Sequence, residues 1–436
     1  MIEILQIIFQ LFLFIFLTSF PVNKYLFNKN SSIKNLSFLS SLSVNSLFLM
    51  FLLLFFSFFK IDLIYIFYFI FFIYFILSFK IFLNKKRKMS NENWPLIIFF
   101  LFALVCVFFK TSYQFELGWD GFSWKEKANF FYNEGYLFDI NEFTKTYQNY
   151  PHLGTYIWAF FWKNSFLGYE YIGRLFYNYI YITSLFAIIL NFQNLNNLKK
   201  IFIFILLFSC TYDDGLGGYQ DYIIFSILTI FAAQLVSHYF NKDNYLFYTV
   251  FLFSGILLPW IKAEGFFYSV FLIIIFFVYQ LQFNKNKNRN LKFLFSFLIV
   301  LSLLIRISVN NIILNENTLF QSNLSNFLSS DLNLNMIFTK IYYILYYIIN
   351  SFFKYPIWLF NSFGLLLSLY FLKNIKVLKV FLIFFILNFL FIFLIYFTTS
   401  ANIVWYLSAS LDRLVLQTSG FYFVIFSLFN NRIIKF

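Results

Sequence analysis

Long apolar segments alternate with short polar ones along the whole chain. Inside a bilayer the backbone has no water to bind, so an apolar run of about 20 residues that crosses lipid must be helical. The segments that this pattern predicts as membrane-spanning helices are 2–20, 37–59, 61–83, 95–109, 170–190, 201–211, 221–239, 245–258, 265–282, 291–309, 356–372, 378–399 and 414–429. We therefore predict an all-α polytopic membrane protein with about 13 transmembrane helices.

The composition excludes several classes of protein. Hydrophobic residues make up 61% of the 436 residues and charged residues only 11%. A soluble domain would have about 25% charged residues, so a water-soluble enzyme is excluded. The sequence also lacks a phosphate-binding loop of the GxxxxGKS or GxxxxGKT type and any cluster of Cys and His. An ATP-driven machine and a zinc enzyme are therefore unsupported.

The basic residues predict the orientation of the spans. Lys85, Lys86, Arg87 and Lys88 form the densest basic cluster, and positive charge in short loops marks the cytoplasmic side. With that loop inside, 20 of the 32 Lys and Arg residues lie inside with only two of the 18 Asp and Glu residues. The cations are spread over short loops, which does not suit a nucleic-acid surface. The acidic chemistry is thus predicted on the outer face.

Under this orientation the outer loops are the longer ones. They are predicted at 110–169, 211–220, 259–264, 310–355 and 400–413. Two segments within them, 154–168 and the tyrosine-rich 336–353, are predicted as helices that lie along the outer interface.

Asp120 is the first candidate for chemistry in these loops. It lies between two tryptophans, Trp119 and Trp124, which suit a water–lipid boundary, and Lys125 and Lys127 follow it closely. A solvated loop carboxylate would explain the segment. The functional alternative is a general base or a metal ligand, with the lysines placed to bind a phosphate or to neutralise Asp120.

A second acidic group lies in the loop 211–220. Asp213 and Asp214 are adjacent carboxylates followed by glycines, and adjacent carboxylates favour a cation, either a metal such as Mg²⁺ or Mn²⁺ or a basic side chain. Helix capping is the alternative. Asp221 lies further on, at the start of an apolar span, where an unpaired carboxylate would cost about 3 kcal/mol. We expect it to have a partner, which the sequence does not identify.

Two further segments carry paired charges. Lys262 and Glu264 lie at an outer turn, where an ion pair would explain them. Asp412 and Arg413 open the last predicted span, where Arg413 could bind a phosphate in a bidentate manner and Asp412 could cap the helix or hold the arginine. Snorkelling of the arginine towards the interface is the alternative interpretation.

Five motifs in the same order resemble the multispanning bacterial glycosyltransferases of the GT-C superfamily, including relatives of the protein mannosyltransferases and aminoarabinose transferases. The motifs are Gly118-Trp119-Asp120 with Trp124 and Lys127-Ala128, Tyr150-Pro151-His152-Leu153, Tyr212-Asp213-Asp214, Lys262-Ala263-Glu264-Gly265 and Ser410-Leu411-Asp412-Arg413-Leu414. The resemblance covers about residues 95–430. It divides the chain into an N-terminal three-span segment, 1–94, and a catalytic membrane domain, 95–436.

The resemblance implies an enzyme that moves a hexose or pentose from a polyprenyl-phosphate donor to a glycan, lipid or protein acceptor on the outer face. Asp120 occupies the position of the family's catalytic acidic residue, and Asp214, or Asp213, corresponds to a second one. Asp213 is an additional acidic residue where many relatives have a small one, so metal dependence stays open. The predicted substrate-binding residues are Lys125, Lys127, Tyr150, Lys262, Glu264 and Arg413.

The predicted location is the bacterial inner membrane, with the active site facing the periplasm or the exterior. Partners would be the lipid-linked donor, the acceptor and the membrane lipids. A transporter or flippase of lipid-linked glycans is the main alternative and would need ionisable groups at the bilayer midplane. A polysaccharide polymerase or ligase is the third hypothesis.

Overall fold

The described part of the chain is mostly α-helical, with short turns between the helices. The computed structural model describes residues 2–19, 38–83, 94–113, 117, 119–133, 135–140, 150–212, 218–241, 244–283, 289–311, 334–373, 375–399 and 402–433. Its α-helices are Ile2–Ser19 (α1), Phe38–Phe56 (α3), Leu63–Leu83 (α4), Trp94–Tyr113 (α5), Trp119–Tyr132 (α6), Leu153–Lys163 (α8), Tyr171–Leu190 (α9), Asn197–Thr211 (α10), Asp221–Asn241 (α11), Asn244–Ile261 (α12), Glu264–Phe283 (α13), Arg289–Val309 (α14), Leu334–Lys354 (α16), Pro356–Tyr370 (α17), Leu378–Thr398 (α18) and Ile403–Ile433 (α19), with a short 3₁₀ helix at Leu137–Asp139 (η2).

Seven of the described helices are long and apolar enough to cross a bilayer: α3, α5, α9, α11, α13, α14 and α18. The helices α1, α4, α12 and α17 supply shorter apolar stretches. The chain is thus an all-α, multi-pass membrane protein by length and composition, but the predicted number of 13 spans is wrong for the described residues. Each predicted span does coincide with a helix. Two of these helices do not qualify as spans. The helix α10 has only 15 residues and is about 22 Å long, whereas the hydrocarbon core is about 30 Å thick. The longer helix α19 contains polar residues that lower its mean hydropathy.

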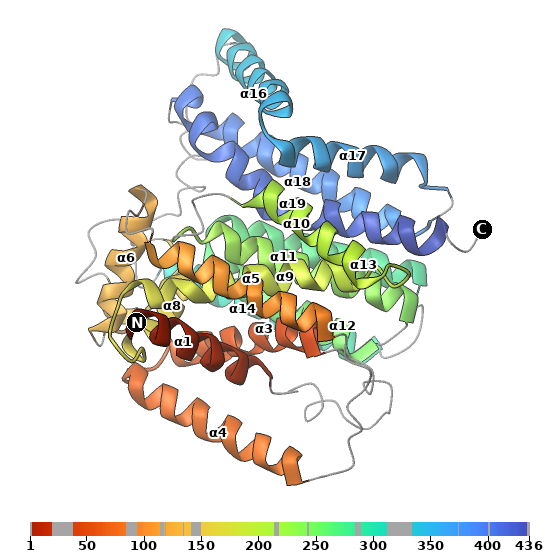
Figure 1. The fold of residues 1–436 in the computed structure, drawn as a ribbon. Helices are drawn as coiled ribbons and strands as arrows, with labels where there is room; N and C mark the ends of the chain where they lie inside the picture. Colours follow the sequence, from red (N-terminus) through yellow and green to blue (C-terminus); the bar gives the residue numbers. More distant parts are fainter. Residues whose placement is uncertain are drawn as a thin grey trace.

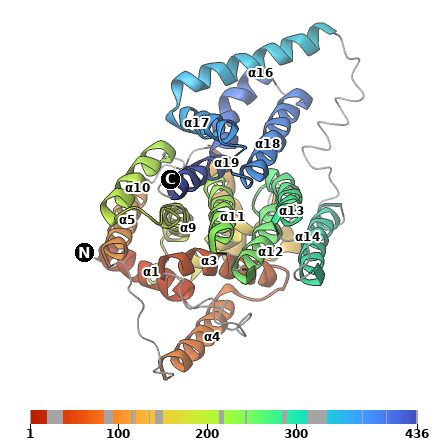
Figure 2. The same ribbon diagram turned by 90° about the vertical axis from the view of Figure 1, so that its right-hand side faces the viewer.

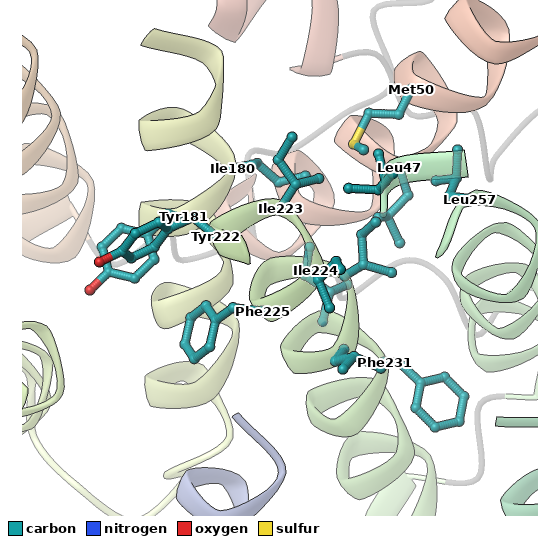
Figure 3. Close-up of a cluster of buried hydrophobic side chains, with 14 of the residues drawn as sticks. Leu47, Met50, Ile180, Tyr181, Tyr222, Ile223, Ile224, Phe225, Phe231 and Leu257 are labelled. Atoms are coloured by element: carbon teal, nitrogen blue, oxygen red, sulfur yellow. The ribbon is translucent and has the colours of Figure 1, made fainter. Parts of the chain in front are cut away.

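The helix α9 lies at the centre of the bundle. Its side chains are buried from Tyr171 to Ile189, as expected for a helix enclosed by others on every side. It contacts α3, α5, α8, α10 and α11, and α11 in turn packs along α19. In Figure 2 the helices α9, α11 and α12 are seen end-on, with the others arranged around them. Figure 3 shows part of the core, where Ile180 and Tyr181 of α9 lie near Tyr222 and Ile223 of α11.

Small residues allow several of these helices to approach closely. A Cβ atom added at Gly420 of α19 would overlap the side chain of Thr229 of α11, and one added at Gly255 of α12 would lie 2.5 Å from Ile299 of α14. Helices in lipid associate through close packing and hydrogen bonds rather than through hydrophobic burial, so such contacts matter for stability. Asn191, which directly follows α9, donates a hydrogen bond of 3.0 Å to a carbonyl oxygen of α11.

The helices α6 and α8 lie together at one end of the bundle, which we call the α6 end (Figure 1). The segment 154–168 was predicted to lie along the interface, and the structure corrects this. Its helix α8 is buried throughout from Leu153 to Phe161, because α6 and α9 pack against it.

The predicted helix at 336–353 is present as α16. Figures 1 and 2 show it crossing the bundle axis rather than running along it.

The N-terminal helices pack into the same bundle. The helix α1 contacts α3, α5 and α9, and α3 contacts α8, α9 and α12. The helix α4 lies further out in Figure 1 and packs on α8. The three-span segment predicted for residues 1–94 therefore shares extensive contacts with the remainder of the chain.

Candidate active site at the α6 end

A partly buried ion pair joins the first turn of α6 to the N-terminal third of α19. The guanidinium of Arg413 donates from Nη1 to Oδ2 of Asp120, and the two side chains are 29% and 37% exposed. Arg413 also lies over the ring of Tyr219, with 5.4 Å from its Cζ to the ring centroid. Its Nε is buried and has no hydrogen-bond partner among the described residues. The guanidinium thus has an N–H donor that none of the described residues uses.

A buried ion pair lies beside it. Lys262 Nζ is 2.9 Å from Oδ1 of Asp221, and these side chains are only 9% and 2% exposed. The same ammonium is 3.5 Å from Oε1 of Glu264. Burial alone would lower the pKa of Lys262, but the Asp221 and Glu264 carboxylates outweigh it and raise the pKa above its usual value. The lysine is therefore held as a cation.

The helix α19 connects the two ion pairs. Gln417 follows Arg413 by one turn, and its Nε2 donates to the same Oδ1 of Asp221 that binds Lys262. Residues four apart lie on one face of a helix, so Arg413 and Gln417 face the same neighbours. We call the group of Asp120, Asp221, Lys262, Glu264 and Arg413 the charged cluster. It holds three carboxylates and two cations.

A close backbone contact brings α6 and the start of α11 together. A Cβ atom added at Gly218 would lie 3.7 Å from the Cα of Gly121 and 3.1 Å from the side chain of Leu117. Gly121 follows Asp120, and Gly218 lies three residues before Asp221. The two glycines therefore allow the segments that carry both carboxylates to pack closely.

A second group of polar residues lies deeper at the α6 end. Lys127 Nζ donates to the carbonyl oxygen of Tyr150 at 2.9 Å, and His152 shares a hydrogen bond of 2.8 Å with Ser57. Arg306 of α14 lies over the ring of Trp260 at 5.4 Å, and that ring also contacts His152. Burial, with the nearby Arg306 charge, lowers the pKa of Lys127 to about 7 and that of His152 well below its usual value.

The predicted site residues therefore divide into two groups. Asp120, Lys262, Glu264 and Arg413 belong to the charged cluster. Lys127 and Tyr150 belong to the deeper group, and Lys125 is half-buried on α6.

Asp213 and Asp214 lie outside the described residues, and so does the predicted Mg²⁺ or Mn²⁺ site. Across the described ranges, no group of three or more His, Cys, Asp and Glu side chains is arranged to hold a metal ion.

The sequence predicted that the motif around Arg413 opens the last helix. The structure shows that this prediction is wrong. The helix α19 begins at Ile403, ten residues before Arg413, and the side chain of Asn402 accepts the backbone N–H of Val404 at 3.0 Å. Asp412 neither caps the helix nor holds the arginine. It accepts the indole N–H of Trp358 at 2.9 Å and joins α19 to α17.

Sequence reasoning missed one pairing within the charged cluster and two residues that contact it. It expected a partner for Asp221 but did not identify Lys262, and it did not consider Gln417 or Tyr219. Gln417 was detectable, because a polar residue one turn after Arg413 within an apolar segment is a residue that needs a partner.

No protein-family model, curated protein or solved structure matches this chain. The resemblance to GT-C glycosyltransferases rests on the five sequence motifs alone.

Proposed function

We propose that this protein is a membrane glycosyltransferase of the GT-C type that transfers a sugar from a polyprenyl-phosphate donor to a hydroxyl acceptor. The observation that carries the proposal is the pairing of Asp120 with Arg413 beside the Asp221–Lys262 pair. These residues come from four segments far apart in the sequence, and three of the four were predicted as site residues from their motifs. A carboxylate and a guanidinium at an accessible position are the groups that this reaction needs.

In the proposed mechanism the acceptor oxygen attacks the anomeric carbon of the donor sugar. A new bond forms between them as the bond from that carbon to the phosphate oxygen breaks, and the phosphate leaves with the electron pair. Asp120 takes the proton of the acceptor hydroxyl, a role for which a carboxylate suffices when the leaving group is a phosphate. Arg413 stabilises the charge that develops on the phosphate, using Nε and its other N–H groups.

Lys262 has a different place in this mechanism. The Lys262 residue is only 7% exposed, and its ammonium is held by two carboxylates, those of Asp221 and Glu264. We propose that it offsets the negative charge of Asp221 and Glu264 beside the donor phosphate, while Asp221 fixes its position. No step is assigned to a metal ion, and the prediction that Asp213 and Asp214 bind one stays a prediction.

The charges at helix ends favour an enzyme over a transporter. Asp221 is the first residue of α11, and Lys262 directly follows the last residue of α12. The buried pair therefore lies near the boundary of the apolar spans, whereas a transport path would need ionisable groups near their middle. The proposed orientation puts the α6 end on the outer face, as the basic inner loops predict.

The test is transfer by the purified protein in nanodiscs. A panel of polyprenyl-phosphate hexoses and pentoses is offered with hydroxyl acceptors, and the release of polyprenyl phosphate is followed by mass spectrometry. We expect Asp120→Asn to reduce release by about 10²–10⁴-fold, the usual contribution of a general base. Asp139→Asn is the matched control, because Asp139 is a carboxylate at the same end that pairs with the exposed Lys60 at 3.3 Å.

Equal rates for wild type and Asp120→Asn would refute the role of Asp120 as base. Absence of release with every donor in the panel would count against the glycosyltransferase itself.

A further inference from the structure

The proposed roles of Asp120 and Arg413 conflict with the contact that joins them. A guanidinium that binds the donor phosphate needs free N–H groups, but Nη1 of Arg413 is engaged by Asp120. A carboxylate that removes a proton needs an oxygen that the acceptor hydroxyl can reach, but Oδ2 of Asp120 is engaged by Arg413. Opening the ion pair would free Nη1 of Arg413 for the phosphate and Oδ2 of Asp120 for the acceptor hydroxyl.

The exposure of the ion pairs indicates which of them can open. Asp120 and Arg413 are 37% and 29% exposed, so water reaches this pair, and ion pairs contribute less as they become more exposed, typically about 1 kcal/mol or less at the surface. Asp221 and Lys262 are 2% and 9% exposed, and separating such a pair leaves a buried charge at high cost. The outer pair is thus the one that an incoming anion can replace.

Arg413 has the means to stay in place when Asp120 leaves. Its guanidinium lies 5.4 Å from the Tyr219 ring, a cation–π contact that does not depend on Asp120. One turn away, Gln417 ties α19 to Asp221. The unused, buried Nε of Arg413 is a further donor for an anionic oxygen.

We propose that Asp120 occupies the anion position of Arg413 in the resting protein, and that the donor phosphate takes this position and releases Asp120 to act as base. This inference rests on the proposed function and adds an order of events to it. The exchange replaces one anion, a carboxylate, by another, a phosphodiester, so the charge next to Arg413 is conserved. Asp120 becomes a base only when a donor is bound, which disfavours premature attack on water or on the wrong acceptor.

Direct binding tests the exchange without transfer. The probe is polyprenyl phosphate, which carries no sugar, added to the full-length protein in nanodiscs, with neutral polyprenol as the reference lipid. Because Asp120 competes for Arg413, we expect Asp120→Asn and Asp120→Ala to bind the phosphate more tightly than wild type, by up to about fivefold. Arg413→Ala should bind at least about tenfold more weakly.

The double variant completes the experiment. Asp120→Asn combined with Arg413→Ala should bind no more tightly than Arg413→Ala alone, because removing the competitor helps only while the arginine is present. Asp139→Asn should match wild type. The two Asp120 variants guard against a folding defect in either one, and each is checked by size-exclusion chromatography and by unchanged polyprenol binding.

Two results separate the failures. If Arg413→Ala loses binding but both Asp120 variants bind equally to or more weakly than wild type, the exchange is wrong and the proposed function stands. If wild type binds polyprenyl phosphate no better than polyprenol, the exchange and the proposed donor are both wrong.

Discussion

The buried pair of Asp221 and Lys262 gives the most quantitative prediction for the fold. Their charged atoms are 2.9 Å apart with almost no exposure, so at an effective dielectric constant of about 20 their attraction is about 6 kcal/mol. Most of this is offset by the cost of taking both charges out of water. Removing one partner leaves the other buried and unpaired, which typically costs 3–5 kcal/mol of the free energy of unfolding.

The two single substitutions should differ in a definite order. Asp221→Asn leaves Lys262 with Glu264 at 3.5 Å, so we expect a loss of about 3 kcal/mol. Lys262→Met removes the cation that contacts the Asp221 carboxylate directly and leaves it the amide of Gln417 and the more distant charge of Arg413, so we expect a larger loss, about 4 kcal/mol. The double variant Asp221→Asn with Lys262→Met should lose clearly less than the sum of the two single losses, because neither partner of the pair is left buried beside an unpaired charge.

Reversible unfolding in mixed detergent micelles, followed by tryptophan fluorescence, measures these losses. Lys60→Met is the control, because Lys60 pairs with Asp139 in an exposed position and should cost at most about 1 kcal/mol. A loss below about 1 kcal/mol for Lys262→Met would contradict the reasoning. So would a double variant whose loss equals the sum of the two single losses.

Three further predictions concern other parts of the fold. The pKa of Lys127 in the folded protein is lowered to about 7, so between that pH and its usual value near 10.5 the unfolded chain binds more protons, and stability should fall as the pH drops through this window. Lys127→Met should remove this dependence of stability on pH, which is up to about 1.4 kcal/mol per pH unit. The measurement is the difference between the unfolding free energies of wild type and variant from pH 7 to 9.5. If the two proteins depend on pH in the same way, the burial of a titrating lysine is contradicted. Gly420→Ala should cost about 1–3 kcal/mol because its Cβ would overlap Thr229, whereas Gly364→Ala, where the nearest atom is 3.3 Å away, should cost less; the reverse order in thermal unfolding would refute the close contact. Asn402→Ala should cost about 1 kcal/mol through loss of the helix cap, and an unchanged melting temperature would show that the cap is not formed in solution.

The sequence predicted the helices well and their ends less well. Every predicted span coincides with a helix, because apolar runs in lipid must be helical. The start of α19 was placed too late, because the polar residues from Ser408 to Arg413 were taken as the end of the apolar segment. A helix that extends beyond lipid does not need to stay apolar, and Asn402, which caps it, was the residue that marked its true start.

The charged cluster was predictable in its members but not in its pairings. The motifs identified Asp120, Lys262, Glu264 and Arg413 separately, because charges near the ends of apolar spans need a reason to be there. Asp120 and Arg413 are 293 positions apart, and Asp221 and Gln417 are 196 positions apart. Such contacts depend on how α6, α11 and α19 pack, which hydropathy along the chain does not encode. The burial of α8 was missed for the same reason.

The helix α16 has a consequence for the depth of the charged cluster in the membrane. Its exposed face is a stripe of large apolar residues: Leu334, Phe338, Tyr342, Leu345, Tyr346, Ile349 and Phe353. Lys340, on the other side, donates to the carbonyl oxygens of Phe397 and Thr399 at 3.0 and 2.9 Å, where α18 ends. These two hydrogen bonds fix α16, which the sequence predicts to lie along the lipid surface, to the bundle at the level where α18 ends and α19 begins. In that position α16 would set the distance between Arg413 and the lipid headgroups. A thicker or thinner bilayer would then adapt around the protein, while this distance stays constant.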